Sequence, residues 1–238
     1  MSEDLLLARL LCTRLCHDLA GPIGAISAGG ELIGTEPDTA DEVMLRLLTG
    51  SAEAASTKLK VFRLAFGWSF VDGTKLTDTS ELMRDYLASI ASPSSTPLLV
   101  WPGADELLLV GGLASDLGPQ LLINLCLLAL EGQPVCSQLR LSVTVRRKML
   151  LMTARSTCVD GRSPSFRPDL REALELRSLE MLTPRTAQAY FTARITESLN
   201  GSIATEIVDD GVLLLAELPL QRAADSDMTE IPSMPGKS

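Results

Sequence analysis

The one histidine of this 238-residue chain, His17, stands directly before an acid, Asp18. Gly21-Pro22 follows four residues later, although the apolar pattern on both sides is that of one uninterrupted helix. Proline inside a helix removes a backbone hydrogen bond and clashes with the carbonyl four residues earlier, which costs about 3 kcal/mol; the glycine adds about 1 kcal/mol. The clashing carbonyl belongs to Asp18. A costly break beside the only imidazole indicates a functional site.

An imidazole beside a carboxylate is suited to nucleophilic chemistry. If Asp18 holds the proton of Nδ1, then Nε2 keeps a free lone pair. The seam of the helix, in which small or apolar residues recur at alternating steps of four and three, indicates where the ring points. The seam consists of Cys12, Cys16, Leu19, Ile23, Ile26, Gly30 and Ile33. His17 lies about 100 degrees round the helix from Cys16 and should therefore face the flank and solvent.

Cys12 and Cys16 lie one helical turn apart beside His17, a spacing that a metal ion could use. Both cysteines fall on the seam, however, whereas His17 faces away from it. We therefore expect no metal site. The five cysteines are odd in number and mostly stand in apolar runs, where Cys behaves as a small hydrophobic residue, so a reducing compartment is expected.

The overall composition excludes further classes of function. A net charge of −9 disfavours nucleic-acid binding, which needs a basic face to neutralise phosphates. No apolar run approaches the roughly 20 residues of a membrane span, and the N-terminal stretch is acidic. We expect a cytoplasmic protein that binds neither nucleic acid nor membrane.

Two long helices are expected before residue 70. The first extends from Cys12 to Ile33 and stops at Gly34, and Thr35 should cap the second, which ends near Gly67. One side of the second helix carries Met44, Leu48, Ser51, Ala55, Lys58 or Leu59, Phe62 and Phe66. Because two helices with one apolar stripe each have no third layer to cover it, the hairpin should pair with a second copy as a dimeric four-helix bundle.

After residue 70 the pattern changes to that of an α+β sandwich, with helices on one face of a mixed sheet. Helices are expected at Ser80–Ala91, Gly118–Glu131, Pro168–Arg177 and Pro184–Leu199, the last two with proline in the first turn, and strands at Pro97–Trp101, Gln138–Arg146, Met149–Arg155, Ser202–Val208 and Val212–Leu218. Phe62, Phe66, Trp68 and Phe70 should pack the hairpin against this part. The expected domains are 1–70, 71–221 and a disordered tail, 222–238.

Three segments carry a resemblance to histidine kinases. His17–Pro22 resembles the H-box, which sits on a dimerising hairpin; Gln120–Ala129 resembles the N-box of the ATP-binding domain; and Ser198–Ile203 resembles the helix-to-strand junction near the end of that domain. The resemblance covers about Leu5 to Leu220. It implies a helical hairpin in a dimeric four-helix bundle, followed by a degenerate ATPase-like α/β sandwich.

The glycine-rich loops that hold ATP in those kinases are missing. A single Asp160-Gly161 pair follows the strand ending near Arg155, and Leu182–Arg185 stands where a glycine cluster would precede a helix. Asn124 matches the metal-binding asparagine of the N-box and is interpreted as a vestige. A kinase-shaped domain without nucleotide loops, joined to an intact H-box, resembles the ChpT-type histidine phosphotransferases of alphaproteobacterial phosphorelays.

This resemblance implies reversible phosphoryl transfer through His17, assisted by Asp18. A homodimer would accept the phosphoryl group from the receiver domain of a hybrid kinase (CckA-like) and pass it to response regulators (CtrA-like and CpdR-like). The receiver would supply Mg²⁺, and the chain would need no cofactor of its own. Two alternatives remain open: an active histidine kinase whose nucleotide loops have diverged, and a catalytically silent dimeric scaffold.

Small residues follow His17 along the helix flank toward the hairpin turn. We expect them to admit the first helix of a receiver, and the residues assigned to this partner contact are Arg14, Ala20, Gly21, Gly24, Ala28 and Ala52. The competing interpretation is that small residues only permit tight packing within the bundle. Gly21 also stands where many H-boxes carry Thr, Asn or Gln to orient a water, so poor phosphatase activity is expected.

Overall fold

The structure of the chain is a computed structural model. It describes residues 2–35, 41–67, 79–90, 96–111, 113, 117–133, 135–159, 161–175, 179 and 181–220. The expected domain boundary at residue 70, the tail over 222–238, and the packing expected of Trp68 and Phe70 lie outside the described residues. So does Asp160.

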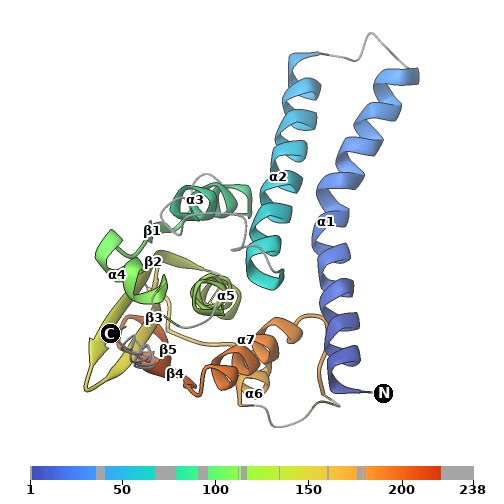
Figure 1. The fold of residues 1–238 in the computed structure, drawn as a ribbon. Helices are drawn as coiled ribbons and strands as arrows, with labels where there is room; N and C mark the ends of the chain where they lie inside the picture. The colour runs from blue at the N-terminus through green and yellow to red at the C-terminus, as the bar shows by residue number, and fades with distance from the viewer. Residues whose placement is uncertain are drawn as a thin grey trace, which may run out of the picture.

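Helices α1 (Glu3–Thr35) and α2 (Glu42–Phe66) form an antiparallel hairpin that projects from the rest of the molecule (Figure 1). The predicted cap at Thr35 is wrong. Thr35 ends α1, and its hydroxyl donates to the Glu31 carbonyl one turn earlier at 3.0 Å, so it is not free to cap α2. Asp41 caps α2 instead, because its carboxylate accepts the Met44 backbone N–H at 2.8 Å.

The predicted seam of α1 does not face α2. Gly29 is buried between the helices, where an added Cβ would lie 2.6 Å from a Leu48 methyl carbon. Gly30, which the periodicity placed on the seam, is exposed, and a Cβ there would meet nothing within 4 Å. Cys12, Cys16 and Ile23 are exposed as well. Leu19, Ile26 and Ile33 are half-buried, so the seam is only partly covered within the single chain.

The rest of the chain forms a mixed sheet with helices, as the α+β prediction required. Its elements are α3 (Thr79–Ile90), β1 (Leu98–Val100), α4 (Ala104–Gly111), α5 (Leu117–Gly132), β2 (Cys136–Arg146), β3 (Met149–Cys158), α6 (Pro168–Leu174), α7 (Ala187–Ser198), β4 (Ser202–Val208) and β5 (Gly211–Pro219). The strand order is β1-β2-β3-β5-β4, with β1 parallel to β2 and the other neighbours antiparallel. Helix α4 was not expected.

Two predicted helices are shorter than expected. Pro184 does not lie in the first turn of α7, because Pro184–Thr186 form a separate turn, closed where the Thr186 N–H reaches the Thr183 carbonyl at 3.1 Å. Helix α6 has Pro168 in its first turn as expected, but it ends at Leu174. Hydrophobic periodicity locates a helix but does not fix its terminal residues, so the start of α7 and the end of α6 were misplaced by a few residues.

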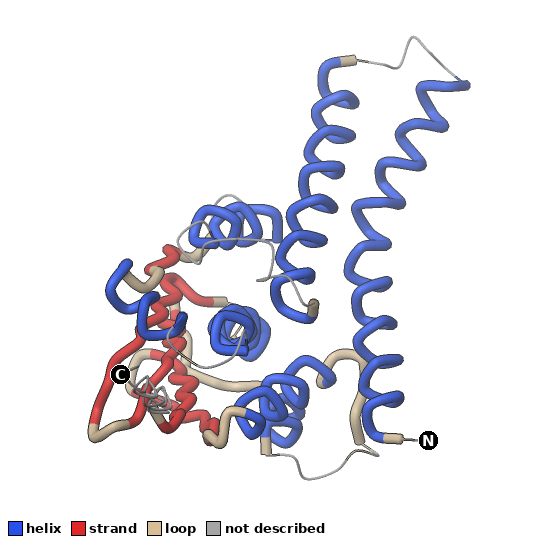
Figure 2. The backbone as a smooth tube through the Cα atoms, in the orientation of Figure 1, coloured by secondary structure: helices blue, strands red, loops and turns tan. Residues whose placement is uncertain are grey.

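Helix α5 lies between the sheet and the base of the hairpin (Figure 2). Residues 118–129 are all buried, as expected for a helix that is apolar on every side. Phe66 at the end of α2 meets Phe191 of α7 edge to face at 5.7 Å, and Phe62 meets Tyr86 of α3 in the same way at 6.4 Å. These aromatic contacts confirm the packing predicted for Phe62 and Phe66.

Within the described residues, no helix is long and apolar enough to span a membrane. The buried cysteines behave as the sequence indicated. Burial raises the pKa of Cys136 to about 11, so its thiol stays protonated near neutral pH.

Candidate functional site

His17 lies in the middle of α1 with its side chain 81% exposed, which confirms the predicted outward direction. Its Nδ1 is 3.2 Å from Oδ1 of Asp18, whose side chain is 30% exposed. If Nδ1 carries the proton and donates to Asp18, the lone pair of Nε2 points to solvent; no described residue hydrogen bonds to Nε2. The pair thus presents a nucleophile to any partner that reaches the flank of α1.

The carbonyl that Pro22 deprives of its helical partner finds another donor. Nζ of Lys58, on α2, donates to the Asp18 carbonyl oxygen at 3.1 Å. Helix α1 continues through Pro22 as one element. The bond offsets part of the cost of the proline and fixes α2 against the turn that carries His17.

We predict that Lys58→Met lowers the free energy of unfolding by about 1–3 kcal/mol, because it leaves the half-buried Asp18 carbonyl unpaired while keeping an unbranched side chain. Pro22→Ala restores a backbone N–H for the same carbonyl, so Lys58→Met should cost less in that background. Denaturant unfolding of the four proteins as a double-mutant cycle measures the difference. Equal costs in both backgrounds would contradict the assignment.

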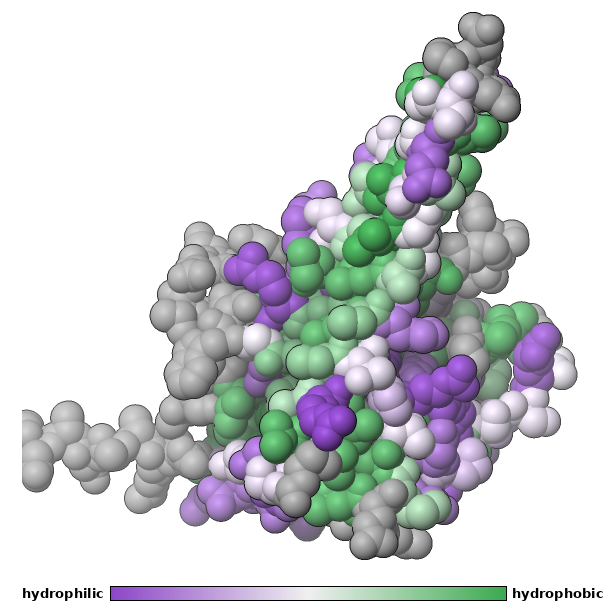
Figure 3. Space-filling model, turned by 90° about the vertical axis from the view of Figure 1, so that its right-hand side faces the viewer, coloured by the Kyte–Doolittle hydropathy of each residue, from purple (hydrophilic) through white to green (hydrophobic). Residues whose placement is uncertain are grey.

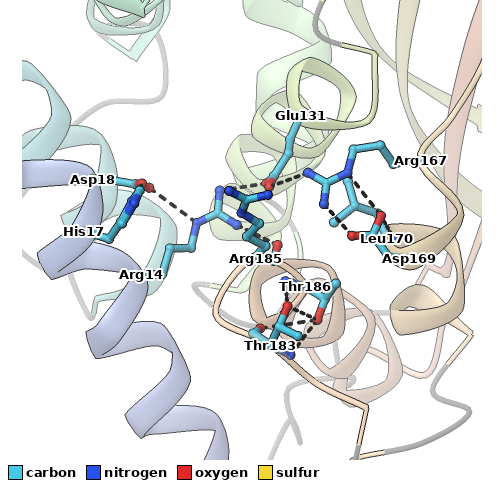
Figure 4. Close-up of polar contacts among 10 residues, drawn as sticks. All are labelled: Arg14, His17, Asp18, Glu131, Arg167, Asp169, Leu170, Thr183, Arg185 and Thr186. Carbon is cyan, nitrogen blue, oxygen red and sulfur yellow. Dashed lines mark hydrogen bonds and ion pairs between the residues drawn. The ribbon is translucent and has the colours of Figure 1, made fainter.

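Arg14 joins the same turn of α1 to the second half of the chain (Figure 4). Its side chain is 14% exposed, and its guanidinium donates to Glu131 Oε2 at 2.7 Å and to the Arg185 carbonyl at 3.0 Å. Its Nε lies 3.6 Å from Asp18 Oδ2. The structure therefore places Arg14 between α1 and α5, in contact with groups of its own chain.

Glu131 has a second cationic partner. Arg167, beside α6, donates to Glu131 Oε1 at 3.2 Å and also pairs with Asp169. The hydrogen bond from the Arg167 guanidinium holds the pKa of Asp169 below its usual value. Glu131 was not predicted as a functional residue, although one signal was present: it is the only charged residue of α5.

The small residues expected at the partner surface lie on both helices of the hairpin. Ala20, Gly21, Gly24 and Ala28 are exposed on α1, and a Cβ added at Gly21 or Gly24 would meet nothing within 4 Å. A shallow groove of about 320 Å³ is lined instead by Pro22, Arg46, Leu47, Gly50, Ser51, Ala54, Lys58 and Ser89. Ala52 is exposed on α2 outside that lining. Arg14 contacts α5 instead and does not line the groove.

Asn124, the residue that matches the N-box asparagine, is completely buried. Its amide nitrogen donates to the Ala65 carbonyl of α2 at 2.8 Å, and its oxygen accepts from Gln188 at 3.2 Å. Gln120 donates to the Gly67 carbonyl at 3.0 Å. Asn124 and Gln120 thus pair with carbonyls at the end of α2 that have no helical donor. An oxygen enclosed in this way is not offered to a metal.

Elsewhere in the described part of the chain, no three His, Cys, Asp or Glu side chains are grouped closely enough to hold a metal ion. This includes the surroundings of Cys12 and Cys16, both of which are exposed.

Comparison with known proteins supplies independent evidence. Residues 119–211 match the family "Histidine phosphotransferase C-terminal domain". Protein phosphotransferase ChpT of Brucella abortus (strain 2308) is 29% identical over 227 residues, which cover 89% of this chain and 95% of the relative. A solved bacterial phosphotransferase has a TM-score of 0.70 at 24% identity, covering 91% of this chain and 97% of that one, so the fold is shared.

A weaker structural likeness, with a TM-score of 0.46 at 13% identity, is to the Acinetobacter baumannii histidine kinase AdeS, over 87% of this chain and 98% of the kinase. The match to ChpT, unlike the family match, extends over almost the whole chain. With the match to the phosphotransferase C-terminal domain, it makes the chain similar to the ChpT-type histidine phosphotransferases over almost its whole length.

Proposed function

We propose that this phosphotransferase works through His17, which becomes phosphorylated at Nε2. The observation that carries the proposal is the exposed imidazole whose Nδ1 lies 3.2 Å from Asp18 Oδ1. That contact favours the tautomer with the proton on Nδ1 and leaves the Nε2 lone pair for attack.

In the forward step, the Nε2 lone pair attacks the phosphorus of an aspartyl phosphate. The P–Nε2 bond forms, the P–O bond to the aspartyl carboxylate breaks, and that carboxylate leaves with the electron pair. The proton stays on Nδ1, so the ring becomes positively charged beside the Asp18 carboxylate, which stabilises it. In the return step a second aspartate attacks the phosphohistidine and the imidazole leaves.

The proposed partners are receiver domains. The donor would be the receiver of a CckA-like hybrid kinase, and the acceptors would be CtrA-like and CpdR-like response regulators. Phosphoryl transfer requires in-line positioning and neutralisation of the phosphate charge. We propose that the receiver brings the Mg²⁺ for this neutralisation and that the chain uses no cofactor of its own.

Incubation with phosphorylated receiver domains from the same genome tests the function. The expected result is an acid-labile, alkali-stable label on this chain that a second receiver can remove. If none of the receivers labels the chain, or if the label has the stability of an acyl phosphate, the proposal is wrong.

We propose further that the chain does not bind ATP. Two observations support this: Asn124 is buried and paired with Ala65 and Gln188, and the sequence offers no glycine-rich phosphate loop. Calorimetric titration with ATP and Mg²⁺ tests it, and saturable binding would favour the alternative of a diverged kinase.

A homodimer completes the proposal. Large apolar side chains are exposed on the hairpin: Leu5, Ile23, Leu32, Val43, Leu45, Leu47 and Leu59. Figure 3 shows apolar side chains gathered along it. Because apolar surface of this extent is unfavourable in water, the hairpin of a second copy would cover it. A light-scattering mass of 25.5 kDa, that of one chain, at micromolar concentration would contradict the dimer.

The exposed small residues of α1 are the proposed receiver contact, and Gly24→Gln tests it. The new side chain would enter open space and glutamine has the higher helix propensity, so we expect a melting temperature that is not lowered. The transfer rate should fall roughly tenfold at subsaturating receiver, equivalent to about 1.4 kcal/mol of weaker docking. Gly34→Gln is the matched control, since Gly34 is equally open but lies far along α1 near the hairpin turn. Equal rates for both variants would place the contact elsewhere.

A further inference from the structure

A line of charged side chains connects His17 to the second half of the chain (Figure 4). His17 Nδ1 is 3.2 Å from Asp18 Oδ1, and Asp18 Oδ2 is 3.6 Å from Arg14 Nε. Arg14 Nη2 then donates to Glu131 Oε2 at 2.7 Å. The nucleophile is thus linked through two side chains of its own helix to an acid on α5.

Burial should make the Arg14–Glu131 pair the most ordered part of this line of charged side chains. The Arg14 side chain is 14% exposed and that of Glu131 18%, so both charges are largely removed from water and need charged partners, which Arg14 finds in Glu131, and Glu131 in both Arg14 and Arg167. Asp18 is 30% exposed and His17 81%, so order should decrease toward the nucleophile. The Arg14–Glu131 pair should therefore set the position of the Asp18–His17 pair.

The hydrogen bonds of Arg14 determine which of its N–H groups lies beside Asp18. The two terminal nitrogens of the guanidinium are occupied by Glu131 and by the Arg185 carbonyl. Its Nε is buried and makes no hydrogen bond to any described residue; the 3.6 Å to Asp18 is an ion-pair distance. Because the guanidinium is planar and held at two nitrogens, its third N–H has a fixed direction.

We propose that Glu131 is a positioning residue for phosphoryl transfer at His17. Glu131 holds Arg14, Arg14 holds the Asp18 carboxylate, and Asp18 keeps the proton on Nδ1 so that Nε2 can attack. This inference rests on the proposed role of His17. Glu131, the one charged residue of α5, would thus give the domain that follows the hairpin a role in orienting the nucleophile.

A purely structural role for the Arg14–Glu131 pair would dock α1 on α5 without affecting the imidazole. The tautomer of His17 distinguishes the two roles. Because His17 is the only histidine, the ring nitrogen signals of ¹⁵N-labelled protein belong to it alone. Glu131→Gln keeps the size of the side chain and removes its charge.

Glu3→Gln is the matched control. Glu3 also joins α1 to the second half of the chain, through Tyr190 and, at 3.6 Å, Arg194. It lies at the start of α1, and none of its recorded contacts involves Arg14, Asp18 or His17. The control therefore weakens docking and leaves the charged line intact.

For Glu131→Gln we expect the maximal single-turnover transfer rate to fall roughly tenfold with an unchanged half-saturating receiver concentration, because the nucleophile is less well oriented. The neutral ring should shift toward the Nε2–H tautomer. Arg14→Met should act in the same way, and the double variant should be no slower than the slower single one. Glu3→Gln should keep the wild-type rate and tautomer.

A wild-type maximal rate in Glu131→Gln would overturn the inference, and so would a rate loss without a change of tautomer. An equal loss in Glu3→Gln would show that docking alone matters. If the wild-type chain accepts no phosphoryl group, the proposed function fails, but the tautomer comparison still decides whether Glu131 orients His17.

Discussion

His17→Ala should abolish acceptance of the phosphoryl group, a loss of at least about a thousandfold in transfer rate, while the protein still folds. The side chain is 81% exposed and its recorded contact is to Asp18, so its removal leaves no cavity. Alanine also has the higher helix propensity. Since the chain has no other histidine, no second imidazole can replace it. Label transfer from a phosphorylated receiver and the melting temperature are the two measurements.

Two neighbouring substitutions control this experiment. Cys16→Ala removes an exposed side chain one residue away and should keep the wild-type rate. Asp18→Asn keeps the shape of the carboxylate but not its charge, so it should transfer slowly rather than not at all. Persistent label on His17→Ala would reveal another acceptor and refute the mechanism.

The outward direction of His17 was predicted from helical geometry, which turns each side chain about 100 degrees from the one before it. The starting point was only partly right, because Cys16, which was assigned to the seam, is itself exposed in the single chain. The long periodic segments were also predictable from the geometry of their elements, which is why α5 and the strands β2 and β5 were found. Gly29 was not assigned to the α1–α2 contact, because the seam of a bundle and the face toward one neighbour differ by a fraction of a turn.

The contacts of Arg14 could not be predicted from local patterns. Its partner Glu131 is 117 residues away, and nothing in the spacing of either residue encodes their meeting. Lys58 is a similar case, since a lysine on an apolar face is ordinarily explained by its apolar stem. The bond from its ammonium to the Asp18 carbonyl becomes visible only when α2 is placed beside Pro22.

Asn124→Asp should destabilise the fold by about 3 kcal/mol or more, since it buries a charge and sets a carboxylate oxygen against the Ala65 carbonyl. For a chain of this size the melting temperature should fall by roughly 6 to 12 °C. Asn124→Leu, which leaves Ala65 and Gln188 unpaired without adding a charge, should cost less. Gln120→Leu removes one bond, to the Gly67 carbonyl, and should cost least.

The pH dependence separates the buried charge from the lost hydrogen bonds. Burial would raise the pKa of the new carboxyl in the folded state, so the folded form of Asn124→Asp would bind a proton that the unfolded form binds only at lower pH. Its deficit relative to wild type should therefore shrink as the pH falls from 8 to 5.5, whereas that of Asn124→Leu should stay constant. Chemical denaturation at both pH values measures this. If Asn124 were an open metal ligand, its substitutions would leave the apo protein as stable as wild type, and that outcome would refute its role at the end of α2.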